Sequence, residues 1–539
     1  MHAQDMPPKG QLAGQPNRGQ RDVINKNTAV WFNPFGEADC ESEVKLLKQE
    51  YSRYFFYHTR FNNLALDPNV FLIIGRRGSG KTALSQFFSF QKVMNRAIAI
   101  DVDEPAAFEK VLEDITLKAP HSREVAIPRI ATIWHLVVWS IIFRELKDLD
   151  PRIHAACIFG TRDEGKLSTF IRHLLKALLD RLVQSEDDLL DELEDIFADK
   201  RVQEGMKAVL QIARTRPVII AFDTLENYAV HDPTMMRATA ALIKCGSEFN
   251  RDYAHLGVHI KIFAMAEVFP YLKEEVILNP LKSVRNEVHM HWRPKDLMRL
   301  ISWRFYSYLH ALDLLLPESR KIDWDSSSDV LEKMWYPYFG RTLRNEQDLP
   351  EHTFPYLLRH TQMRPRQLIV LCNAIARRAK AQGTFPRFHP DLIVRAIQDS
   401  QNALAEEVIN SYSSVYPKVG RILEALSGIP MIFRGNELDK RAPITASEWS
   451  GEYSPHGFRQ LVSELGIIGR VRHLSPDAGY AEADFEYSIE SRLPLLSDNV
   501  CAVHPMFYRK LNVQYENRVR VYPFPDHEDF KPWRLPKQP

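Results

Sequence analysis

The first half of the chain alternates between continuous apolar runs and stretches in which apolar residues recur every three or four positions. Apolar runs at 70–74, 96–102, 217–222 and 258–266 predict buried strands. Helical patterns lie between these runs, for example at 82–93. Strands that alternate with helices form a parallel sheet that is covered on both faces. The pattern therefore predicts an α/β fold built on a parallel sheet.

A long helical stretch separates the second of these strands from the third. Residues from about 107 to 215 are expected to form a helical insertion, and its most apolar part, 130–143, is expected to be a buried core helix. These fourteen residues are too few to span a bilayer, and His135 interrupts them, so no membrane segment is expected. The segment 185–199 holds eight acidic residues and no basic one. Its leucines keep helical spacing, which favours a solvated helix face, with an acidic docking surface as the alternative.

The second half of the chain has a different pattern. Beyond residue 294 the apolar runs stop, and amphipathic helices predict a helical lid. Helices at 414–427 and 454–465, followed by two strands around the turn "SPDAGY", predict a winged helix. The predicted domains are a disordered leader (1–28), an α/β core (29–293), the lid (294–408), a winged-helix-like domain (409–513) and a Pro-rich tail (514–539).

One loop contains a sequence motif with an expected role in binding. The strand expected at 70–74 runs into Gly75-x-x-x-x-Gly80-Lys81-Thr82, and a helix is expected to follow, which is the context of a P-loop. Glycine lets successive backbone N–H groups converge on phosphate oxygens. Lys81 is expected to reach the β- and γ-phosphates of ATP, and the Thr82 hydroxyl to bind Mg²⁺. The residues expected to contact the nucleotide are Gly75, Gly78, Ser79, Gly80, Lys81, Thr82 and Ala83.

A P-loop also needs an acidic residue at the end of a neighbouring strand to hold Mg²⁺. Asp223 ends an apolar strand and is expected to take this role, because strand ends face the crevice in which ligands bind in such sheets. Glu226 lies three residues further on. Two roles stay open for it, the base that activates water and the cap of the following helix.

Composition and charge limit the classes of protein to which this chain can belong. The 539 residues are 45% hydrophobic and 26% charged, as in an ordinary globular protein, and the formal net charge of +1 gives no global attraction for nucleic acid or an anionic membrane. The five cysteines are scattered, which fits neither a disulfide framework nor a zinc site. We expect a cytoplasmic protein.

The order of motifs resembles a known family. The segments "GRRGSGKT", "VIIAFDTLE", the later strand, the lid with "RPRQLI" and the winged helix are similar to P-loop ATPases of the AAA+/STAND type, in particular KAP-like and origin-recognition-initiator-like ATPases. The resemblance covers about 30–515. It implies that Arg366, at the start of a lid helix, is a sensor arginine that touches the γ-phosphate. It also implies that the upstream segment "NPFGEADCESEVKLL" lies near adenine.

The sequence departs from this family at two positions. Thr224 stands where a second acidic residue is common, and the strand at 258–266 ends in Ala264, Met265 and Ala266, then Glu267, where many members carry a polar or arginine sensor. Mg²⁺ binding is therefore expected to be intact, and hydrolysis to be slow or stimulated by a partner.

Partners are expected from the same resemblance. A homo-oligomer is expected, with Arg285 or Arg304 as an arginine supplied in trans, together with an effector or partner protein. The segment 359–380 holds six Lys/Arg and no acid. It is expected either to contact nucleic acid or to be a basic, solvated helix face.

Three functions are consistent with the pattern. The leading one is a slow ATPase that acts as a nucleotide-dependent assembly switch, a role that the resemblance connects with antiphage defence, mobile elements and DNA transactions. The second is a nucleic-acid-binding protein in which ATP is structural. The third, a kinase, is less favoured because a separate lid and a winged helix replace the short lid and acceptor pocket that a kinase requires.

Overall fold

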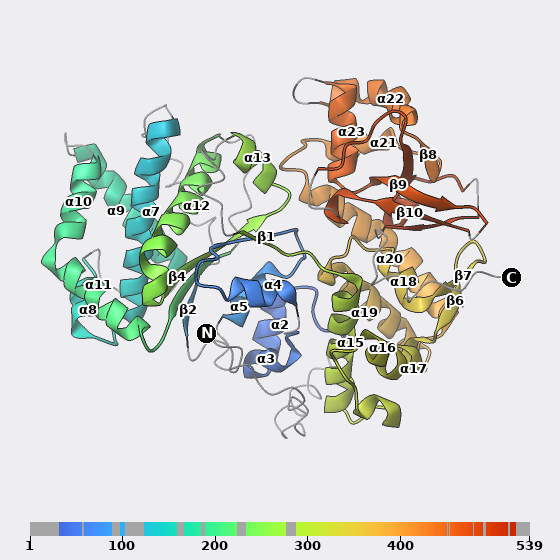
Figure 1. Cartoon of the computed structure of the whole chain (residues 1–539), viewed down its shortest axis with the longest axis horizontal. Coiled ribbons are helices and arrows are strands. Elements are labelled where there is room, and N and C mark those ends of the chain that lie inside the picture. The colour runs from blue at the N-terminus through green and yellow to red at the C-terminus, as the bar shows by residue number, and fades with distance from the viewer. Residues whose placement is uncertain are drawn as a thin grey trace. The chain divides into compact units, whose positions relative to one another are not determined.

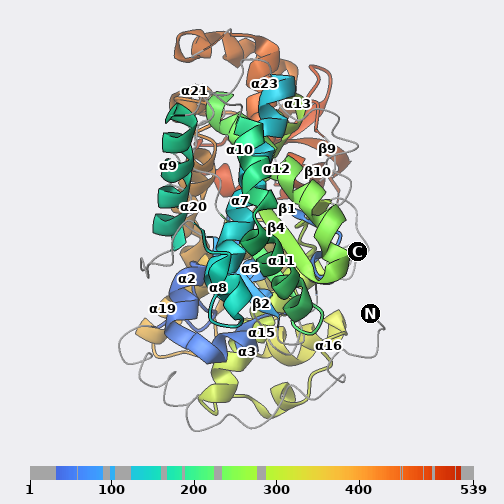
Figure 2. The ribbon, with the colours of Figure 1, turned by 90° about the vertical axis from the view of Figure 1, so that its left-hand side faces the viewer.

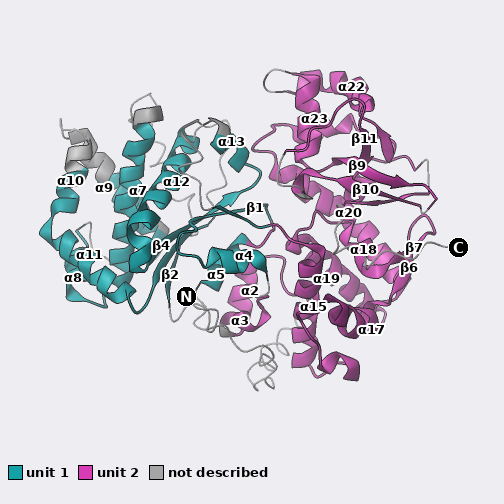
Figure 3. Cartoon of the chain, viewed as in Figure 1, with its two compact units in different colours: residues 1–11, 59–77, 81–290 teal, residues 12–58, 78–80, 291–539 magenta. Residues whose placement is uncertain are grey.

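The computed structural model describes most of the chain as two compact units. The described residues are 32–56, 59–88, 97–102, 123–158, 167–184, 189–223, 233–275, 287–449, 451, 453–477, 479–488, 492–515 and 518–523. Unit 1 contains 59–77 and 81–290, and unit 2 contains 12–58, 78–80 and 291–539 (Figure 3). The last junction between the units lies near the predicted boundary at 293/294, but the described residues 32–56, which the predicted core included, are grouped with unit 2. The predicted separation of the lid from the C-terminal domain stays a prediction.

Unit 1 is built on a five-stranded parallel sheet, as the sequence pattern predicts (Figure 1). Its order is β2-β3-β4-β1-β5, and every neighbouring pair is parallel. The strands are β1 (Leu72–Gly75), β2 (Ile98–Val102), β3 (Val218–Phe222), β4 (Val258–Met265) and β5 (Glu287–His289). The sequence analysis missed β5, because three residues with one buried side chain give no apolar run. The fold is an α/β P-loop core.

Helices cover both faces of this sheet. In α12 (Pro233–Tyr253), a Cβ at Gly246 would lie 2.7 Å from Ile262, so the helix packs closely on this face of β4. Phe263, the next residue of β4, points to the opposite face and contacts Phe88, which follows α5 (Lys81–Phe87). Alternating side chains of one strand thus meet helices on both sides.

The predicted helical insertion is confirmed over its described part. Its helices are α7 (Arg123–Leu146), α8 (Pro151–Ala155), α9 (Leu167–Gln184), α10 (Leu189–Ala198) and α11 (Lys200–Ala213) (Figure 2). The length argument against a membrane span was wrong, because the apolar part of α7 covers Ala126–Leu146, which is long enough to cross a bilayer. Burial gives the better argument, since 78% of its apolar window is buried inside the protein and Trp134 donates its indole N–H to the Ala238 carbonyl. This helix is a core helix.

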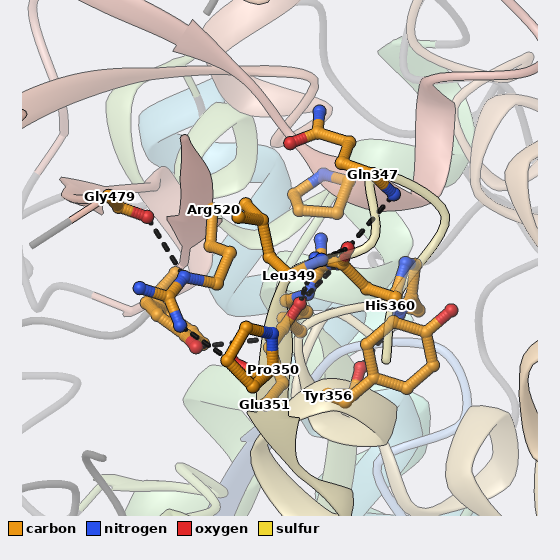
Figure 4. A network of polar contacts seen from close by, with 12 residues as sticks. Gln347, Leu349, Pro350, Glu351, Tyr356, His360, Gly479 and Arg520 are labelled. Carbon is orange, nitrogen blue, oxygen red and sulfur yellow. Dashed lines mark hydrogen bonds and ion pairs between the residues drawn. The ribbon is translucent and has the colours of Figure 1, made fainter. Parts of the chain in front are cut away.

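Unit 2 begins with helices that the sequence pattern predicts. Its main helices are α2 (Cys40–Leu47), α3 (Tyr51–Tyr54), α15 (Pro294–Ala311), α18 (Thr353–Leu358), α19 (Pro365–Ala381) and α20 (Pro390–Ser411). The lid predicted at 294–408 is not purely helical, because β6 (Thr342–Arg344) and β7 (Pro350–His352) form an antiparallel hairpin. The Asn345 side chain accepts from the backbone N–H groups of Gln347 and Leu349 and so forms the turn that the pattern did not reveal (Figure 4).

The C-terminal part contains the predicted helices and hairpin within a larger sheet. Helices α21 (Val419–Glu424) and α23 (Pro455–Glu464) are followed by the antiparallel pair β9 (Ile468–Ser475) and β10 (Tyr480–Asp484). The hairpin is part of a five-stranded sheet of order β12-β10-β9-β11-β8, completed by β8 (Ile432–Arg434), β11 (Val500–Val503) and β12 (Arg520–Tyr522). A short helix, α22 (Asn436–Arg441), follows β8. The hairpin is therefore not a free wing, and the winged-helix assignment stays a prediction.

The prediction of a Pro-rich tail at 514–539 is wrong for part of this segment, because β12 lies within it. This strand pairs in parallel with β10. Arg520 donates to the carbonyls of Gly479 and Pro350 at 2.9 and 2.7 Å, and Tyr522 donates to the carboxylate of Glu351 (Figure 4). The prolines that follow the strand, beginning with Pro523 and Pro525, concealed a short segment whose Val521 is fully buried. The residues after 523 lie outside the described part.

Candidate nucleotide-binding site

The P-loop connects β1 to α5, as the motif predicts. Gly78 and Gly80 have φ values of 80° and 97°, in a region that side chains other than glycine rarely adopt. These two glycines are required by the backbone of the loop. The expected strand–loop–helix context is present, and residues 78–80 are grouped with unit 2 while the flanking residues are grouped with unit 1.

Lys81 lies at the first position of α5 and is buried. Its Nζ donates a hydrogen bond of 3.0 Å to the carbonyl of Gly75, at the other end of the loop. The side chain thus folds back over the loop instead of extending into solvent. Thr82 and Ala83 follow in the same helix and are half-buried.

Asp223 follows β3 directly and is 3% exposed. Its backbone N–H donates to the Val102 carbonyl, which fixes it at the carboxyl end of the sheet. Strand β4 lies between β3 and β1, so the axes of the two strands that carry Asp223 and the P-loop are roughly 10 Å apart, two strand spacings. Asp223 and the loop therefore end at the same edge of the sheet, and its role as a Mg²⁺ ligand stays a prediction.

A second acid beside the loop was noticed in the sequence only as a departure from the family pattern. Glu267 follows β4, and its Oε1 accepts the backbone N–H of Arg77 at 3.1 Å. The preceding residue, Ala266, donates its N–H to the Gly75 carbonyl. Strand β4 pairs with β1, so this buried carboxylate is fastened directly to the first half of the P-loop.

Within unit 2, two donors contact the carbonyl groups in the middle of the P-loop. The indole Nε1 of Trp292 donates to the Ser79 carbonyl at 2.8 Å, and the backbone N–H of Arg366 donates to the Gly78 carbonyl at 3.3 Å. A Cβ at Gly78 would lie 3.1 Å from the Cβ of Arg366, so the first turn of α19 packs closely on this glycine. The sequence analysis missed Trp292, because no motif marks it.

The Arg366 guanidinium has partners of its own in unit 2. Its Nε donates to the Ala38 carbonyl at 3.0 Å, and its Nη1 lies 3.5 Å from a carboxylate oxygen of Glu407. The backbone N–H and the Cβ of Arg366 thus lie against Gly78, while its guanidinium binds other groups of unit 2. Its expected action on the γ-phosphate stays a prediction.

Arg304 is not placed to act as an arginine supplied in trans to another copy. It lies in α15, and both of its terminal nitrogens bind the carboxylate of Glu43, with side-chain exposures of 8% and 2%. A guanidinium that is buried and paired in this way does not reach the site of another copy. The other candidate, Arg285, and the residues Thr224 and Glu226 lie outside the described part of the chain.

The basic segment 359–380 is less exposed than its charge count indicates. Arg359 is paired with buried Glu351 at 3.0 Å, and Arg364 is 2% exposed and donates to the Gln362 side chain. Arg377 donates to Asn33, and Arg378 pairs with Asp399. The solvated basic face is therefore restricted to the end of α19, which weakens the case for a nucleic-acid contact there.

Across the described residues, no group of three or more His, Cys, Asp or Glu side chains could hold a metal ion by itself. All five cysteines are free thiols. The expectation that Thr82 and Asp223 are Mg²⁺ ligands stays a prediction.

Comparison with known proteins leaves the family open. No protein-family model matches the chain, and no curated protein matches it. Among solved structures, the Aeropyrum pernix ORC2 protein with ADPNP and ADP is 11% identical, with a TM-score of 0.33 over 87% of this chain and 90% of that chain. Its ADP form is 11% identical, with a TM-score of 0.27 over 93% and 92%. At these TM-scores the similarity defines no family, and the P-loop core rests on the chain's own loop and strand order.

Proposed function

We propose that the chain binds MgATP at the P-loop and hydrolyses it slowly. The observation that carries this proposal is the P-loop itself, which leaves the end of β1 in a parallel sheet with two glycines at positive φ and a buried lysine folded over it. Backbone N–H groups in such a loop favour an anion. Buried Asp223 at the same edge of the sheet supplies the negative charge that a Mg²⁺–phosphate complex needs.

In this proposal, each residue of the nucleotide site has a defined part. The N–H groups of the loop hold the phosphates, and Lys81 exchanges the Gly75 carbonyl for phosphate oxygens. Thr82 and Asp223 hold Mg²⁺, which would offset the negative charge of the phosphates during transfer to water. Glu267 and Glu226 are the candidates for the base that orients water, since Thr224 has no carboxylate.

We further propose that the ATP state controls assembly with another copy or with a partner protein. The absence of an acid at Thr224 supports slow turnover, which favours a switch over a motor. An arginine supplied in trans contributes on the order of 10³ to 10⁵ in rate, so self-assembly would raise specific activity steeply. The alternative is a nucleic-acid-binding protein in which bound ATP never turns over.

The test is binding and turnover of MgATP by the parent chain and by Lys81→Ala. The variant removes one charge-assisted contact, worth about 1.5–3 kcal/mol, so its Kd for ATP is expected to rise about 10- to 150-fold. Lys207→Ala is the matched control, because this lysine is an exposed helix residue paired with Glu204. Equal ATP affinity in the parent and in Lys81→Ala would remove the P-loop assignment. Tight binding without turnover at any protein concentration would favour the structural-ATP alternative.

A further inference from the structure

The peptide groups at the centre of the P-loop are held from outside the loop. A trans peptide is planar, and its C=O and N–H point in opposite directions. A donor that binds the carbonyl of one residue therefore also sets the direction of the next residue's N–H. In unit 2, the Trp292 indole binds the Ser79 carbonyl at 2.8 Å and so fixes the Gly80 N–H.

A second donor acts in the same way one residue earlier. The backbone N–H of Arg366 binds the Gly78 carbonyl at 3.3 Å and sets the direction of the Ser79 N–H. Both N–H groups are therefore directed away from Trp292 and α19. A Cβ built at Gly80 would meet no described heavy atom within 4 Å, so the loop is open beside this residue.

We propose that Trp292 is a positioning residue of the nucleotide site, which holds the Ser79–Gly80 peptide so that the Gly80 N–H is directed at a polyphosphate. The proposal rests on the proposed function and deepens it. Without the indole N–H, the Ser79–Gly80 peptide is less constrained, because a glycine at φ 97° also tolerates the reversed orientation of this peptide. Binding of phosphate would then have to order this peptide as well.

The chemical class of the ligand follows from the Gly80 N–H, which is the group that Trp292 positions. A backbone N–H recognises a phosphate oxygen and does not recognise adenine or ribose. The effect of Trp292 should therefore appear with inorganic pyrophosphate as well as with ATP. This separates a positioning role from a contact with the base.

The experiment compares Trp292→Phe with Trp303→Phe in the full chain. Both changes keep an aromatic ring and remove an indole N–H that binds a backbone carbonyl, since Trp303 donates to Arg53 at 3.2 Å in the same unit. For Trp292→Phe, the Kd for MgATP and the inhibition constant of pyrophosphate are both expected to rise about two- to tenfold, the loss typical of one neutral hydrogen bond. Trp303→Phe is expected to leave both unchanged.

The outcomes are separable. Unchanged ATP affinity in Trp292→Phe overturns the proposal, and so does weaker ATP binding with unchanged pyrophosphate inhibition. Failure of the parent chain to bind either compound overturns the proposed function as well.

A second measurement covers the case in which Trp292→Phe does not fold. The parent chain is labelled with 5-fluorotryptophan, and the signals of its nine tryptophans are assigned by replacing the other eight one at a time, so that Trp292 is identified without a change at its own position. The ¹⁹F signal of Trp292 is expected to shift when pyrophosphate is added while that of Trp303 stays in place. A Trp292 signal that does not respond at saturating pyrophosphate overturns the proposal.

Discussion

Arg304 and Glu43 form a two-point ion pair inside unit 2, with Nη1–Oε1 and Nη2–Oε2 distances of 2.6 and 2.9 Å. The pair joins α15 to α2, and Arg304 also lies 3.4 Å from the Phe35 carbonyl. Two residues that are 261 positions apart in the chain are thereby held together. The segment that precedes the α/β core is thus part of the packing of unit 2, and its arginine partner is structural.

We therefore predict that Arg304→Ala destabilises the fold. Removal of one partner leaves the other charge buried and uncompensated, which costs about 3–5 kcal/mol. The denaturation midpoint of the full chain should fall clearly, as followed by circular dichroism in urea. Arg53→Ala is the control, because Arg53 pairs with Glu50 at the surface and such pairs are worth about 0–1 kcal/mol. An unchanged midpoint combined with lost ATPase activity would restore Arg304 as an arginine supplied in trans.

The second prediction concerns Lys261 in β4. Its Nζ donates to the carbonyls of Asp67 and Val70 at 2.7 and 2.5 Å, just before β1, and burial lowers its pKa to about 7. In the unfolded chain the pKa is near its ordinary value of 10.5. Between these two values the unfolded state binds more protons, so this lysine makes stability rise with pH from about 7 to 10.5 and contributes no slope below 7.

The difference between the parent and Lys261→Met measures this effect. Met cannot titrate, so the gap in unfolding free energy between the two proteins should shift in favour of the parent as the pH rises from 7 to 10. His259, whose pKa is lowered to about 4 by burial and by the Lys261 charge, titrates below this range, and groups without contact to Lys261 cancel. Urea denaturation at several pH values is the measurement, and a gap that stays constant across this range would contradict a lowered lysine pKa.

These contacts show which parts of the fold the sequence could predict. Apolar runs identified β1 to β4 without knowledge of their neighbours: β1, β3 and β4 are buried along their whole length, and β2 is an apolar run in which two of five residues are buried. Strands β5, β6, β7 and β12 have three residues each; β5 and β12 pair with strands distant in the chain, and β6 and β7 pair with each other across a turn. Their stability comes from pairing and from groups such as Asn345 and Tyr522, which no local pattern marks.

The same division applies to the candidate site. The P-loop and Asp223 follow from a motif and from the end of a strand, which are local features. Trp292 is distant from the loop in sequence, and Glu267 appeared only as a departure from a family pattern. Both act on backbone groups of the loop, and a backbone group accepts any donor or acceptor that packing brings to it. The sequence therefore contains no signal that identifies the partner.

The third prediction separates the two candidate bases. Glu267→Gln keeps an oxygen that can accept the Arg77 N–H and removes the charge, so ATP affinity should stay within about twofold if the role is to fasten the loop. Glu226→Gln should bind ATP and slow its hydrolysis about 10²- to 10⁴-fold, the usual contribution of a general base. Single-turnover hydrolysis under saturating enzyme is the measurement. If Glu267→Gln traps ATP and Glu226→Gln does not, the base is Glu267.

The last prediction is that the full chain binds duplex DNA only weakly, although its C-terminal part has the helices and hairpin of a winged-helix pattern. Non-specific affinity depends on basic side chains that are free to neutralise phosphates. In the hairpin, Arg470 lies 3.9 Å from Asp484, and Arg472 lies 4.0 Å from Glu482 and from Asp484, so its positive charges face acids on the adjacent strand. In the segment 359–380, Arg359 and Arg364 are buried.

We expect a Kd no tighter than about 10⁻⁵ M at physiological salt, within the usual non-specific range, measured by fluorescence anisotropy with and without MgATP. Arg472→Ala should then change the affinity little, whereas submicromolar, sequence-selective binding that this substitution abolishes would make DNA recognition the main function of the C-terminal part.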